Sequence, residues 1–375
     1  MPPRLMNRTF YNNLADKALA GEVLERAVCE TILTDRGVDL MPLLNAAYEV
    51  REHHWGKEVA IHILNNAANG YCPEDCGYCA QSKNSTADIG EYPLKSDDEI
   101  LAEAKAAYEN GAFRYCMVFS GRGPSPRRVE KICSLIERIK AIYPLEICVS
   151  AGLMDEPATT KLKAAGLDRM NHNLNTSRDH YEKICTTHTW DDRINTLKAA
   201  GAVGLEVCSG MIIGIGEPAS DIIDVALQLR ELKARSIPVN FLLPIEGNPI
   251  GRPEELTPEF CLRVLCLFRF LNPEVELRAA AGREYHLRNL EVLALYPANS
   301  IFLQGYLNTQ GNADTKTLQM IRDAGFTIKS DIPLDDLLTR PETVAETLPQ
   351  IACSGPTMKK LHDLRPNAAR QTMKA

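Results

Sequence analysis

Three cysteines crowded into one short loop constrain this chain more than any other feature. Cys72, Cys76 and Cys79 lie at spacings of four and three residues, in a segment that also contains proline and glycine. Thiolates at this density are either cross-linked or bound to metal, and a disulfide would leave one thiol unpaired. Zinc normally recruits a fourth Cys or His nearby, whereas the next cysteine, Cys116, is far along the chain. Iron–sulfur cubes ordinarily take four thiolates. Three therefore predict a cluster with one iron open to a small molecule.

The composition of the chain limits the partners and the cellular compartment that we expect for this metal chemistry. The chain has 375 residues, enough for one large domain or two, and a net charge of −7. This charge gives no reason to expect nucleic acid or an anionic membrane as a partner, and no apolar run is long enough to span a bilayer. Twelve cysteines without an export signal indicate a reducing compartment. We expect the cytoplasm, with a weak organelle-targeting alternative in the basic residues 1–13.

Hydrophobic periodicity divides the chain into three parts. Residues 1–57 follow a helical pattern and predict an N-terminal helical extension that packs on the main domain. Residues 58–326 alternate short strands with amphipathic helices, which predicts a (β/α)8 TIM-type barrel, and a doubly wound open sheet is the alternative. Residues 327–375 form a C-terminal extension with a polar tail from Met358 that we expect to be disordered. The expected strands are 59–64, 113–119, 146–150, 168–174, 204–213, 238–243, 274–280 and 299–303. The expected helices include 96–109, 126–142, 220–234, 257–271 and 314–324.

Three further cysteines each fall within a predicted strand. Cys116, Cys148 and Cys208 are separated by one and then two β/α units, and Arg278 follows two units later. They would therefore lie on strands two, three, five and seven of the barrel, facing one lumen. A single free cysteine in a strand is most often a packing residue. The common spacing of the three cysteines and Arg278 is equally compatible with a second metal site and with simple packing.

The predicted fourth strand carries Asn171, Asn173 and Asn175 at a period of two, so these side chains would share one face. Asparagine is a poor strand former and is costly to bury without partners. The face therefore suggests a polar ligand surface, suited to ribose hydroxyls or a cyclic urea. Asn240 on the sixth strand adds another amide. The alternative is that these amides satisfy loop backbone. His172 would point outward into the helix layer, and we do not expect it to act in catalysis.

Two weaker features complete the inventory. Gly214 and Gly216 end the fifth strand just before a helix, where glycine permits close approach of a ligand and a helix N-terminus favours anions. The remaining six cysteines mostly fall on helical stretches, and we interpret them as packing residues. They are Cys29, Cys133, Cys185, Cys261, Cys266 and Cys353.

These motifs together resemble a known family. The loop has the C-x3-C-x-aromatic-C pattern of radical S-adenosylmethionine enzymes, with Tyr78 before the last cysteine. With the Asn-His-Asn-Leu-Asn-Thr-Ser run, Val-Cys208-Ser-Gly, Pro-Val-Asn240-Phe and Arg278-Ala-Ala-Ala-Gly-Arg, the chain resembles the biotin synthases up to about Phe326. The last fifty or so residues lie outside the resemblance.

The resemblance implies a specific chemistry. Cys72, Cys76 and Cys79 would hold a [4Fe–4S] cluster whose open iron binds S-adenosylmethionine, and a 5′-deoxyadenosyl radical would abstract hydrogens from dethiobiotin. A [2Fe–2S] cluster would donate the sulfur that completes biotin. Its ligands would be Cys116, Cys148, Cys208 and Arg278.

The resemblance also implies ligand contacts. Tyr78, Asn173, Asn175, Gly214 and Gly216 would contact S-adenosylmethionine. Asn171 and Asn240 would contact dethiobiotin. An electron donor such as flavodoxin or ferredoxin and a homodimeric state are expected.

The chain departs from the family pattern at two positions, and one role stays open. Asn175 stands where some members have Asp, and Met170 stands where an aromatic residue is frequent. Arginine stays protonated in proteins. Arg278 could therefore be a counter-charge rather than an iron ligand. Two other functions also remain open: a different radical S-adenosylmethionine lyase or mutase, and a non-catalytic electron-transfer or scaffold protein.

Overall fold

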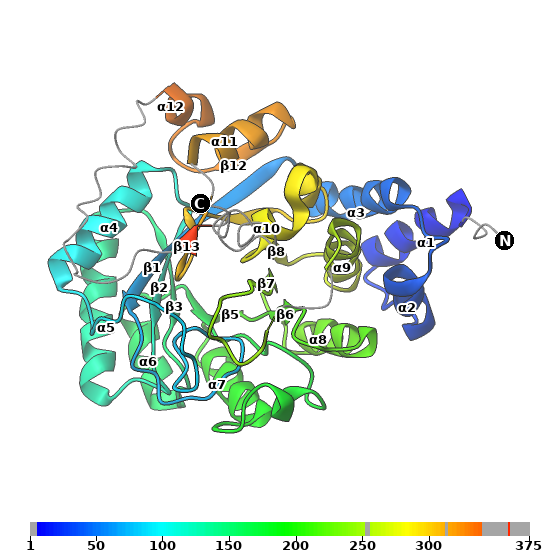
Figure 1. The fold of residues 1–375 in the computed structure, drawn as a ribbon. Coiled ribbons are helices and arrows are strands. Elements are labelled where there is room, and N and C mark those ends of the chain that lie inside the picture. The colour runs from blue at the N-terminus through cyan, green and yellow to red at the C-terminus, as the bar shows by residue number, and fades with distance from the viewer. Residues whose placement is uncertain (1–5, 252–255, 312–313, 340–358, 361–375) are drawn as a thin grey trace, which may run out of the picture.

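A closed barrel of parallel strands forms the centre of the molecule (Figure 1). The structure is a computed structural model and describes residues 6–251, 256–311, 314–339 and 359–360. We call each strand of the barrel a stave. The last stave pairs with the first, with Ala60 opposite Ser300, and this pairing closes the barrel. The staves are β1 (Glu58–Ala68), β2 (Arg114–Phe119), β3 (Glu146–Ser150), β4 (Arg169–Asn171), β5 (Glu206–Cys208) with β6 (Met211–Ile213), β7 (Ser236–Phe241), β8 (Glu276–Ala279) and β9 (Ser300–Leu303). The predicted (β/α)8 barrel is confirmed and the open sheet is excluded.

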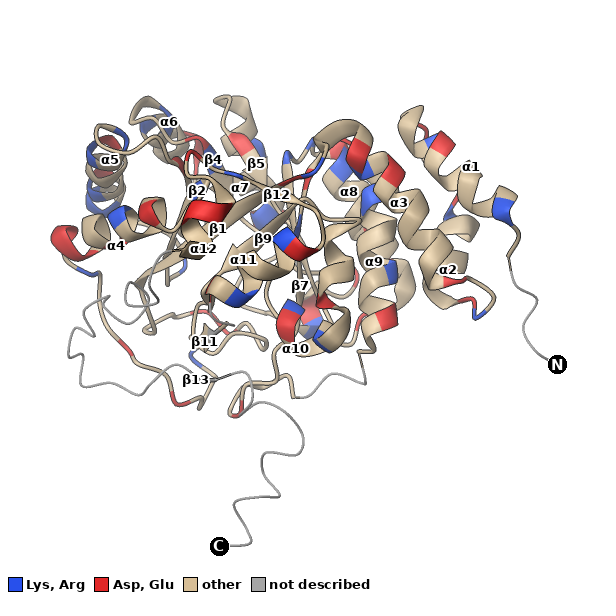
Figure 2. Ribbon diagram, turned by 90° about the horizontal axis from the view of Figure 1, so that it is seen from above, with Lys and Arg blue, Asp and Glu red and all other residues tan. Residues whose placement is uncertain are grey.

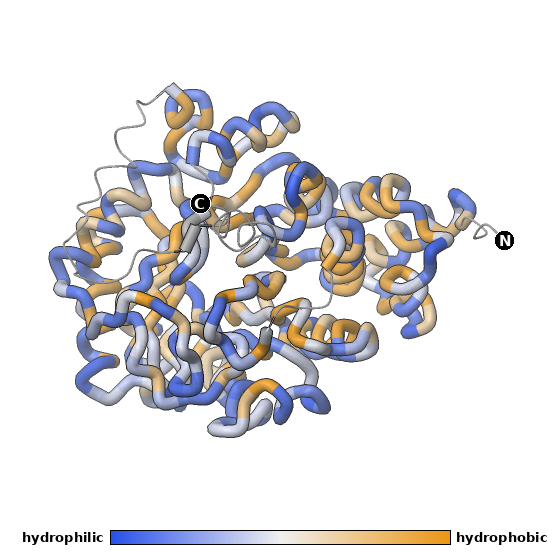
Figure 3. The backbone as a smooth tube through the Cα atoms, viewed as in Figure 1, coloured by the Kyte–Doolittle hydropathy of each residue, from blue (hydrophilic) through white to orange (hydrophobic). Residues whose placement is uncertain are grey.

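Helices cover the outside of the barrel (Figure 3), and they bury apolar residues at helical spacing, as Val129, Ile132 and Ile136 of α5 show. Local signals fix several helix starts, such as the capping box of Ser96 and Glu99, in which each side chain bonds the other's backbone N–H. The helices between staves are α4 (Asp97–Glu109), α5 (Pro126–Lys140), α6 (Glu156–Ala164), α7 (Trp190–Ala202), α8 (Ala219–Glu231) and α9 (Pro258–Leu271). After β8 come the short α10 (Arg283–Leu287) and the 3-10 helix η2 (Arg288–Leu295).

The N-terminal helices pack on one side of the barrel, as expected (Figure 1). They are α1 (Arg8–Leu19), α2 (Arg26–Thr34) and α3 (Leu40–Trp55), and they contact α8 and α9. Arg263 on α9 donates to the carbonyl oxygens of Ile32, Asp35 and Val38 at 3.2, 2.8 and 2.6 Å. The helix α9 is therefore covered on both faces, which explains why most of its residues are buried. Many of the charged residues belong to the outer helices (Figure 2).

Two staves are shorter than the sequence predicts. The fourth ends at Asn171, so Asn173 and Asn175 follow the strand instead of belonging to it. The fifth is interrupted between Cys208 and Met211. A side chain at Gly210 would meet the carbonyl oxygen of Pro238 at 1.8 Å, so the backbone approaches the neighbouring stave too closely for any other residue.

The C-terminal segment adds one short strand to the barrel sheet, beside β1. β12 (Thr327–Lys329) pairs with β1, and α11 (Asp314–Asp323) and α12 (Leu334–Thr339) lie beside it. A separate small sheet contains β10 (Gly305–Tyr306), β11 (Thr309–Gln310) and β13 (Lys359–Lys360). The division into parts 1–57, 58–326 and 327–375 stays a prediction. The predicted disordered tail lies outside the described residues, apart from 359–360. No described helix has the length and apolarity needed to cross a membrane.

Candidate metal centres in the barrel

The barrel lumen is built in layers two residues apart. The first inward-facing positions of the staves carry a group of charged and polar residues. Two residues further along the same strands lie Cys116, Cys148, Cys208 and Arg278. Because side chains two residues apart on a strand share a face, the polar layer and the thiol layer are stacked along the barrel axis. The three-cysteine loop follows β1 at the carboxyl end of the strands, where barrel enzymes place their active sites.

The loop of Cys72, Cys76 and Cys79 is held by two other segments of the chain. The N–H of Gly77 donates to the carbonyl oxygen of Ile184 at 2.8 Å, and its own carbonyl accepts from Ile250 N at 2.9 Å. All three thiols are free; Cys76 is buried and the other two are half-buried. Burial raises the pKa of Cys79 to about 11. A metal that binds here must displace that proton, as metal sites built from thiols do.

A second loop, residues 185–188, lies against the cysteine loop and was missed by the sequence analysis. Asp75 Oδ1 accepts from the N–H groups of Thr186 and Thr187 at 2.9 and 3.2 Å. Glu74 Oε2 lies 2.6 Å from Nδ1 of His188. Cys185 lies outside any helix. It packs in the core as predicted, and it also contacts Cys76, which the sequence analysis did not foresee. A hydrogen bond shared with Cys76 lowers the pKa of Cys185.

Asn171, Asn173 and Asn175 do not share one face of a strand. The first two lie beside the thiol layer, and Asn175 lies beside the cysteine loop. Asn171 Nδ2 lies 3.3 Å from Cys208 Sγ and 3.1 Å from Asn173 Oδ1, so both amides border the thiol layer. Asn175 adopts a left-handed backbone conformation with φ of 68° and donates to the hydroxyl of Tyr78. The predicted strand 168–174 therefore ends early, at Asn171, but the turn that follows still directs the asparagine amides toward the thiol layer and the cysteine loop.

Arg193 joins these parts, although nothing in its helical sequence context singles it out. From α7 its Nη1 donates to the carbonyl oxygen of Asn173 at 2.8 Å. Its Nη2 lies 3.3 Å from the Tyr78 hydroxyl and 2.9 Å from Nε2 of His188. The buried guanidinium thus ties the asparagine turn to both loops. His172, which the sequence analysis placed in the helix layer, is buried. Burial lowers its pKa well below the usual value, and Arg193 and His188 contribute to the shift.

The three strand cysteines border one cavity of about 410 Å³ in the lumen. Cys116 and Cys148 are direct partners across β2 and β3. A hydrogen bond from Cys148 lowers the pKa of Cys116, and the same bond raises the pKa of Cys148 to about 12. A further bond with Cys148 raises the pKa of Cys208. The three thiols therefore belong to one buried cluster, in which Cys148 is the neighbour of both others. The lining also includes Arg278, Asn171, Asn173, Phe302 and Tyr306.

Below the thiols lies a buried ionic network centred on Glu276. Its carboxylate lies 2.6 Å from Arg278, 2.8 Å from Arg114, 3.1 Å from Arg169 and 3.1 Å from His62. Burial by itself would raise the pKa of Glu276, but the adjacent Arg114 and Arg169 hold it well below the usual value. Burial, with help from Arg278, lowers the pKa of His62 to about 3, so this ring is neutral. No single signal in the sequence identifies this network, because its members come from four separate strands.

The ionic network sets the orientation of the Arg278 guanidinium beside the cavity. Its Nη2 contacts Glu276, Ser236 Oγ at 3.0 Å and His62 Nε2 at 3.3 Å. Its buried Nε has no hydrogen-bond partner among the described residues. The Glu276 carboxylate therefore fixes Nη2 of the guanidinium, while Nε remains available to a group in the cavity. This arrangement, with three thiols around the same cavity, fits a metal centre.

The glycine turn after β6 is already used by the protein. Gly214 and Gly216 have φ of 96° and 94°, the conformation that favours glycine. However, the N–H groups of Gly214 and Ile215 both donate to the carboxylate of Glu217 at 2.8 Å. The N–H groups of Gly214 and Ile215 are therefore already bonded within the protein. Contact of the two glycines with a cofactor stays a prediction.

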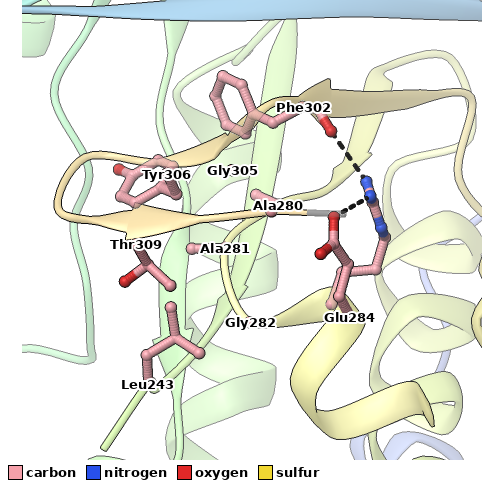
Figure 4. A pocket seen from close by; sticks show the side chains of 11 residues that line it. Leu243, Ala280, Ala281, Gly282, Glu284, Phe302, Gly305, Tyr306 and Thr309 are labelled. Atoms are coloured by element: carbon pink, nitrogen blue, oxygen red, sulfur yellow. Dashed lines mark hydrogen bonds and ion pairs between the residues drawn. The ribbon is translucent and has the colours of Figure 1, made fainter. Parts of the chain in front are cut away.

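A second cavity, of about 320 Å³, adjoins the first through Phe302 and Tyr306 (Figure 4). Arg283 donates to the carbonyl oxygen of Phe302 at 3.1 Å and pairs with Glu284 at 2.9 Å, which fixes one wall. Asn240 borders neither of these two cavities. It is buried, with Nδ2 donating to Met211 O at 3.1 Å and Oδ1 accepting from Ala281 N at 3.2 Å.

We expect Asn240→Ala to lower the free energy of unfolding by about 1–3 kcal/mol, because two buried backbone groups lose their partner. Urea unfolding measures this, and Asn45→Ala on the exposed face of α3 is the matched control. If Asn240 also binds substrate, the variant should lose affinity for dethiobiotin more than for S-adenosylmethionine. Equal loss for both ligands would leave Asn240 with the backbone role alone.

Comparisons with known proteins agree with this geometry. Residues 69–229 match the Radical SAM superfamily, and residues 238–327 match the Biotin and Thiamin Synthesis associated domain. The chain is 55% identical over 316 residues to biotin synthase of Magnetococcus marinus, covering 84% of this chain and 98% of that protein. It is 54% identical to biotin synthase of Acaryochloris marina, covering 84% and 91%.

Solved structures support the fold at low sequence identity. Methylornithine synthase superposes with a TM-score of 0.71 at 21% identity, over 88% of this chain and 99% of that one. The FeFe-hydrogenase maturase from Carboxydothermus hydrogenoformans superposes with a TM-score of 0.72 at 17% identity, over 89% and 83%. The barrel with its three-cysteine loop thus defines a radical S-adenosylmethionine enzyme. Within that class, the chain belongs to the biotin synthase family, and its enzymatic role is in biotin synthesis.

Proposed function

We propose that the chain converts dethiobiotin to biotin, with Cys72, Cys76 and Cys79 holding a [4Fe–4S] cluster and Cys116, Cys148 and Cys208 holding a [2Fe–2S] cluster. When bound, the first group supplies the reductive cleavage of S-adenosylmethionine and the second supplies the sulfur. The observation that carries the proposal is a cavity bordered by the three strand thiols and by Arg278. This cavity lies within the barrel, and the cysteine loop follows β1 at the carboxyl end of the strands.

The residues of the chain supply position, charge and exclusion of water. Asn171 and Asn173 border the cavity and offer amide groups that match the polarity of a ureido ring or a ribose. Phe302 and Tyr306 close its side with aromatic surface. A lumen enclosed in this way keeps reactive carbon species from solvent. Tyr78 and Asn175 support the cysteine loop through their mutual hydrogen bond.

The contacts of Arg278 bear on whether it is a counter-charge or an iron ligand. Its contacts with Glu276 favour a charged guanidinium. This supports a counter-charge beside the inner cluster, while ligation through the remaining nitrogen atoms stays part of the family expectation. The further expectations are an electron donor such as flavodoxin or ferredoxin, a homodimer and a cytoplasmic location.

The decisive test is anaerobic turnover. Protein reconstituted with iron and sulfide is incubated with S-adenosylmethionine, a reductant and dethiobiotin, and biotin is measured by mass spectrometry. We expect biotin together with 5′-deoxyadenosine and methionine. Cleavage of S-adenosylmethionine without biotin would favour a different radical S-adenosylmethionine lyase or mutase. No cleavage at all would favour an electron-transfer role. Cys133→Ala on α5 serves as the control for cysteine replacement, since Cys133 is only partly buried and lies on a helix outside the lumen.

A further inference from the structure

Cys185 forms a sulfur contact with Cys76 that the proposed chemistry does not use. The two Sγ atoms are 3.7 Å apart. Both side chains are buried, with 8% of Cys76 and 3% of Cys185 exposed, and neither is in a disulfide. We propose that this pair is a redox modification site: after cluster loss, a peroxide oxidises Cys76 and Cys185 to a disulfide that keeps Cys76 recoverable. This inference rests on the proposed role of Cys76 as a cluster ligand.

The backbone holds the two cysteines side by side. The N–H of Gly77, which follows Cys76, donates to the carbonyl oxygen of Ile184, which precedes Cys185, at 2.8 Å. This backbone hydrogen bond holds the two cysteine-bearing segments next to each other, as a disulfide requires, since it spans Cα atoms about 4.4–6.8 Å apart. The pairing therefore comes from the fold and does not depend on a chance side-chain rotamer.

Side chains next to the pair clamp the same two loops together. Asp75 accepts from two consecutive backbone N–H groups that directly follow Cys185, those of Thr186 and Thr187. One residue further, His188 contacts Glu74 at 2.6 Å. With both loops fixed, bond formation needs the sulfur atoms to move from 3.7 Å to about 2.05 Å. Rotation about the side-chain bonds can provide much of this approach.

The chemistry balances with hydrogen peroxide as the oxidant. The Cys76 sulfur attacks one peroxide oxygen, so an S–O bond forms, the O–O bond breaks and hydroxide leaves as water after taking a proton. The Cys185 sulfur then attacks the sulfenic sulfur, an S–S bond forms, and the S–O bond breaks with loss of a second water. Two electrons pass from the thiol pair to the peroxide. Hydrogen peroxide is small enough to reach a site bordered by the half-buried Cys72 and Cys79.

The consequence is protection of the cluster site. A sulfenic acid without a neighbouring thiol is oxidised further to a sulfinic acid, which cellular thiols do not reverse, whereas a disulfide is reduced by thiol exchange. The protein could then receive a new cluster. Cys185 would thus act after oxidative damage and would not be required in the catalytic cycle.

The test uses reconstituted full-length protein that is treated with hydrogen peroxide and an iron chelator, digested without reductant and analysed by mass spectrometry. We expect a cross-linked peptide pair containing Cys76 and Cys185, two hydrogen atoms lighter than the free peptides. In Cys185→Ala we expect Cys76 to carry two extra oxygen atoms instead. After dithiothreitol and fresh iron and sulfide, the wild type should regain its cluster absorbance, while the oxidised Cys185→Ala variant should not. Cys133→Ala should behave as the wild type does.

Two results would overturn the proposal. One is a link from Cys76 to Cys72 or Cys79 in place of Cys185. The other is equal recovery of the cluster by the wild type and Cys185→Ala. If Cys185→Ala does not fold, Cys185→Ser provides the same readout with a side chain of similar size. Because the peptide map does not require turnover, a failure of this proposal is distinguishable from a failure of the proposed biotin-forming activity.

Discussion

Replacing Glu276 by glutamine is expected to lower the free energy of unfolding by about 3–5 kcal/mol, which is the range for removing one partner from a buried ion pair. Glutamine keeps the shape of the side chain but removes the charge that three guanidinium groups share. Arg114 and Arg278 are fully or almost fully buried, and Arg169 is nearly so. Their charges would be left without the carboxylate that compensates them, and water cannot replace it at this depth.

Urea unfolding measures this effect, and Glu206→Gln is the matched control. Glu206 also pairs with Arg169, but 44% of its side chain is exposed. Solvent screens this pair, so the control should lose at most about 1 kcal/mol. A loss that small in Glu276→Gln would contradict a stabilising role of the network.

The stability difference between the wild type and Glu276→Gln should depend on pH. The direction of this dependence follows from the depressed pKa of Glu276. A carboxylate whose pKa is lower in the folded state stabilises the fold fully above its unfolded pKa of 4.5. This contribution is lost as the pH falls toward the folded pKa. The stability difference between the wild type and Glu276→Gln should therefore be constant near neutral pH and shrink in acid. A difference that grows below pH 4.5 would contradict this account.

Replacing Cys148 by alanine is expected to remove the inner metal centre and leave the outer one. Cys148 lies directly opposite Cys116 across β2 and β3, and both line the same cavity as Cys208, so its loss removes one of the three thiols available to the metal. Anaerobic analysis should find about six irons per chain in the wild type, the sum of a cube and a two-iron cluster, and about four in the variant. Biotin formation should fall below detection, while cleavage of S-adenosylmethionine should persist.

Cys133→Ala is again the control, and it should keep all the iron. A wild-type content of four irons, unchanged in Cys148→Ala, would mean that the strand cysteines only pack. A loss of all iron in Cys148→Ala would indicate unfolding, which circular dichroism would reveal. The iron count therefore distinguishes a second cluster from buried thiols without relying on activity.

The sequence by itself determined the barrel and the order of its main features. Alternation of short strands with amphipathic helices is a local pattern, and the spacing of Cys72, Cys76 and Cys79 lies within a single loop, so both are readable along the chain. The positions of Cys116, Cys148, Cys208 and Arg278 were also predictable, because a regular β/α repeat converts sequence separation into position around the barrel.

Only the tertiary structure decided which groups surround those features. Glu276 meets His62, Arg114 and Arg169 because strands from distant parts of the chain align their first inward positions, and that alignment depends on strand register. Cys185 reaches Cys76 because two loops are joined by a backbone hydrogen bond. The fifth stave is interrupted where the backbone at Gly210 packs directly against Pro238. Contacts of this kind depend on distance in space, which hydrophobic periodicity does not encode.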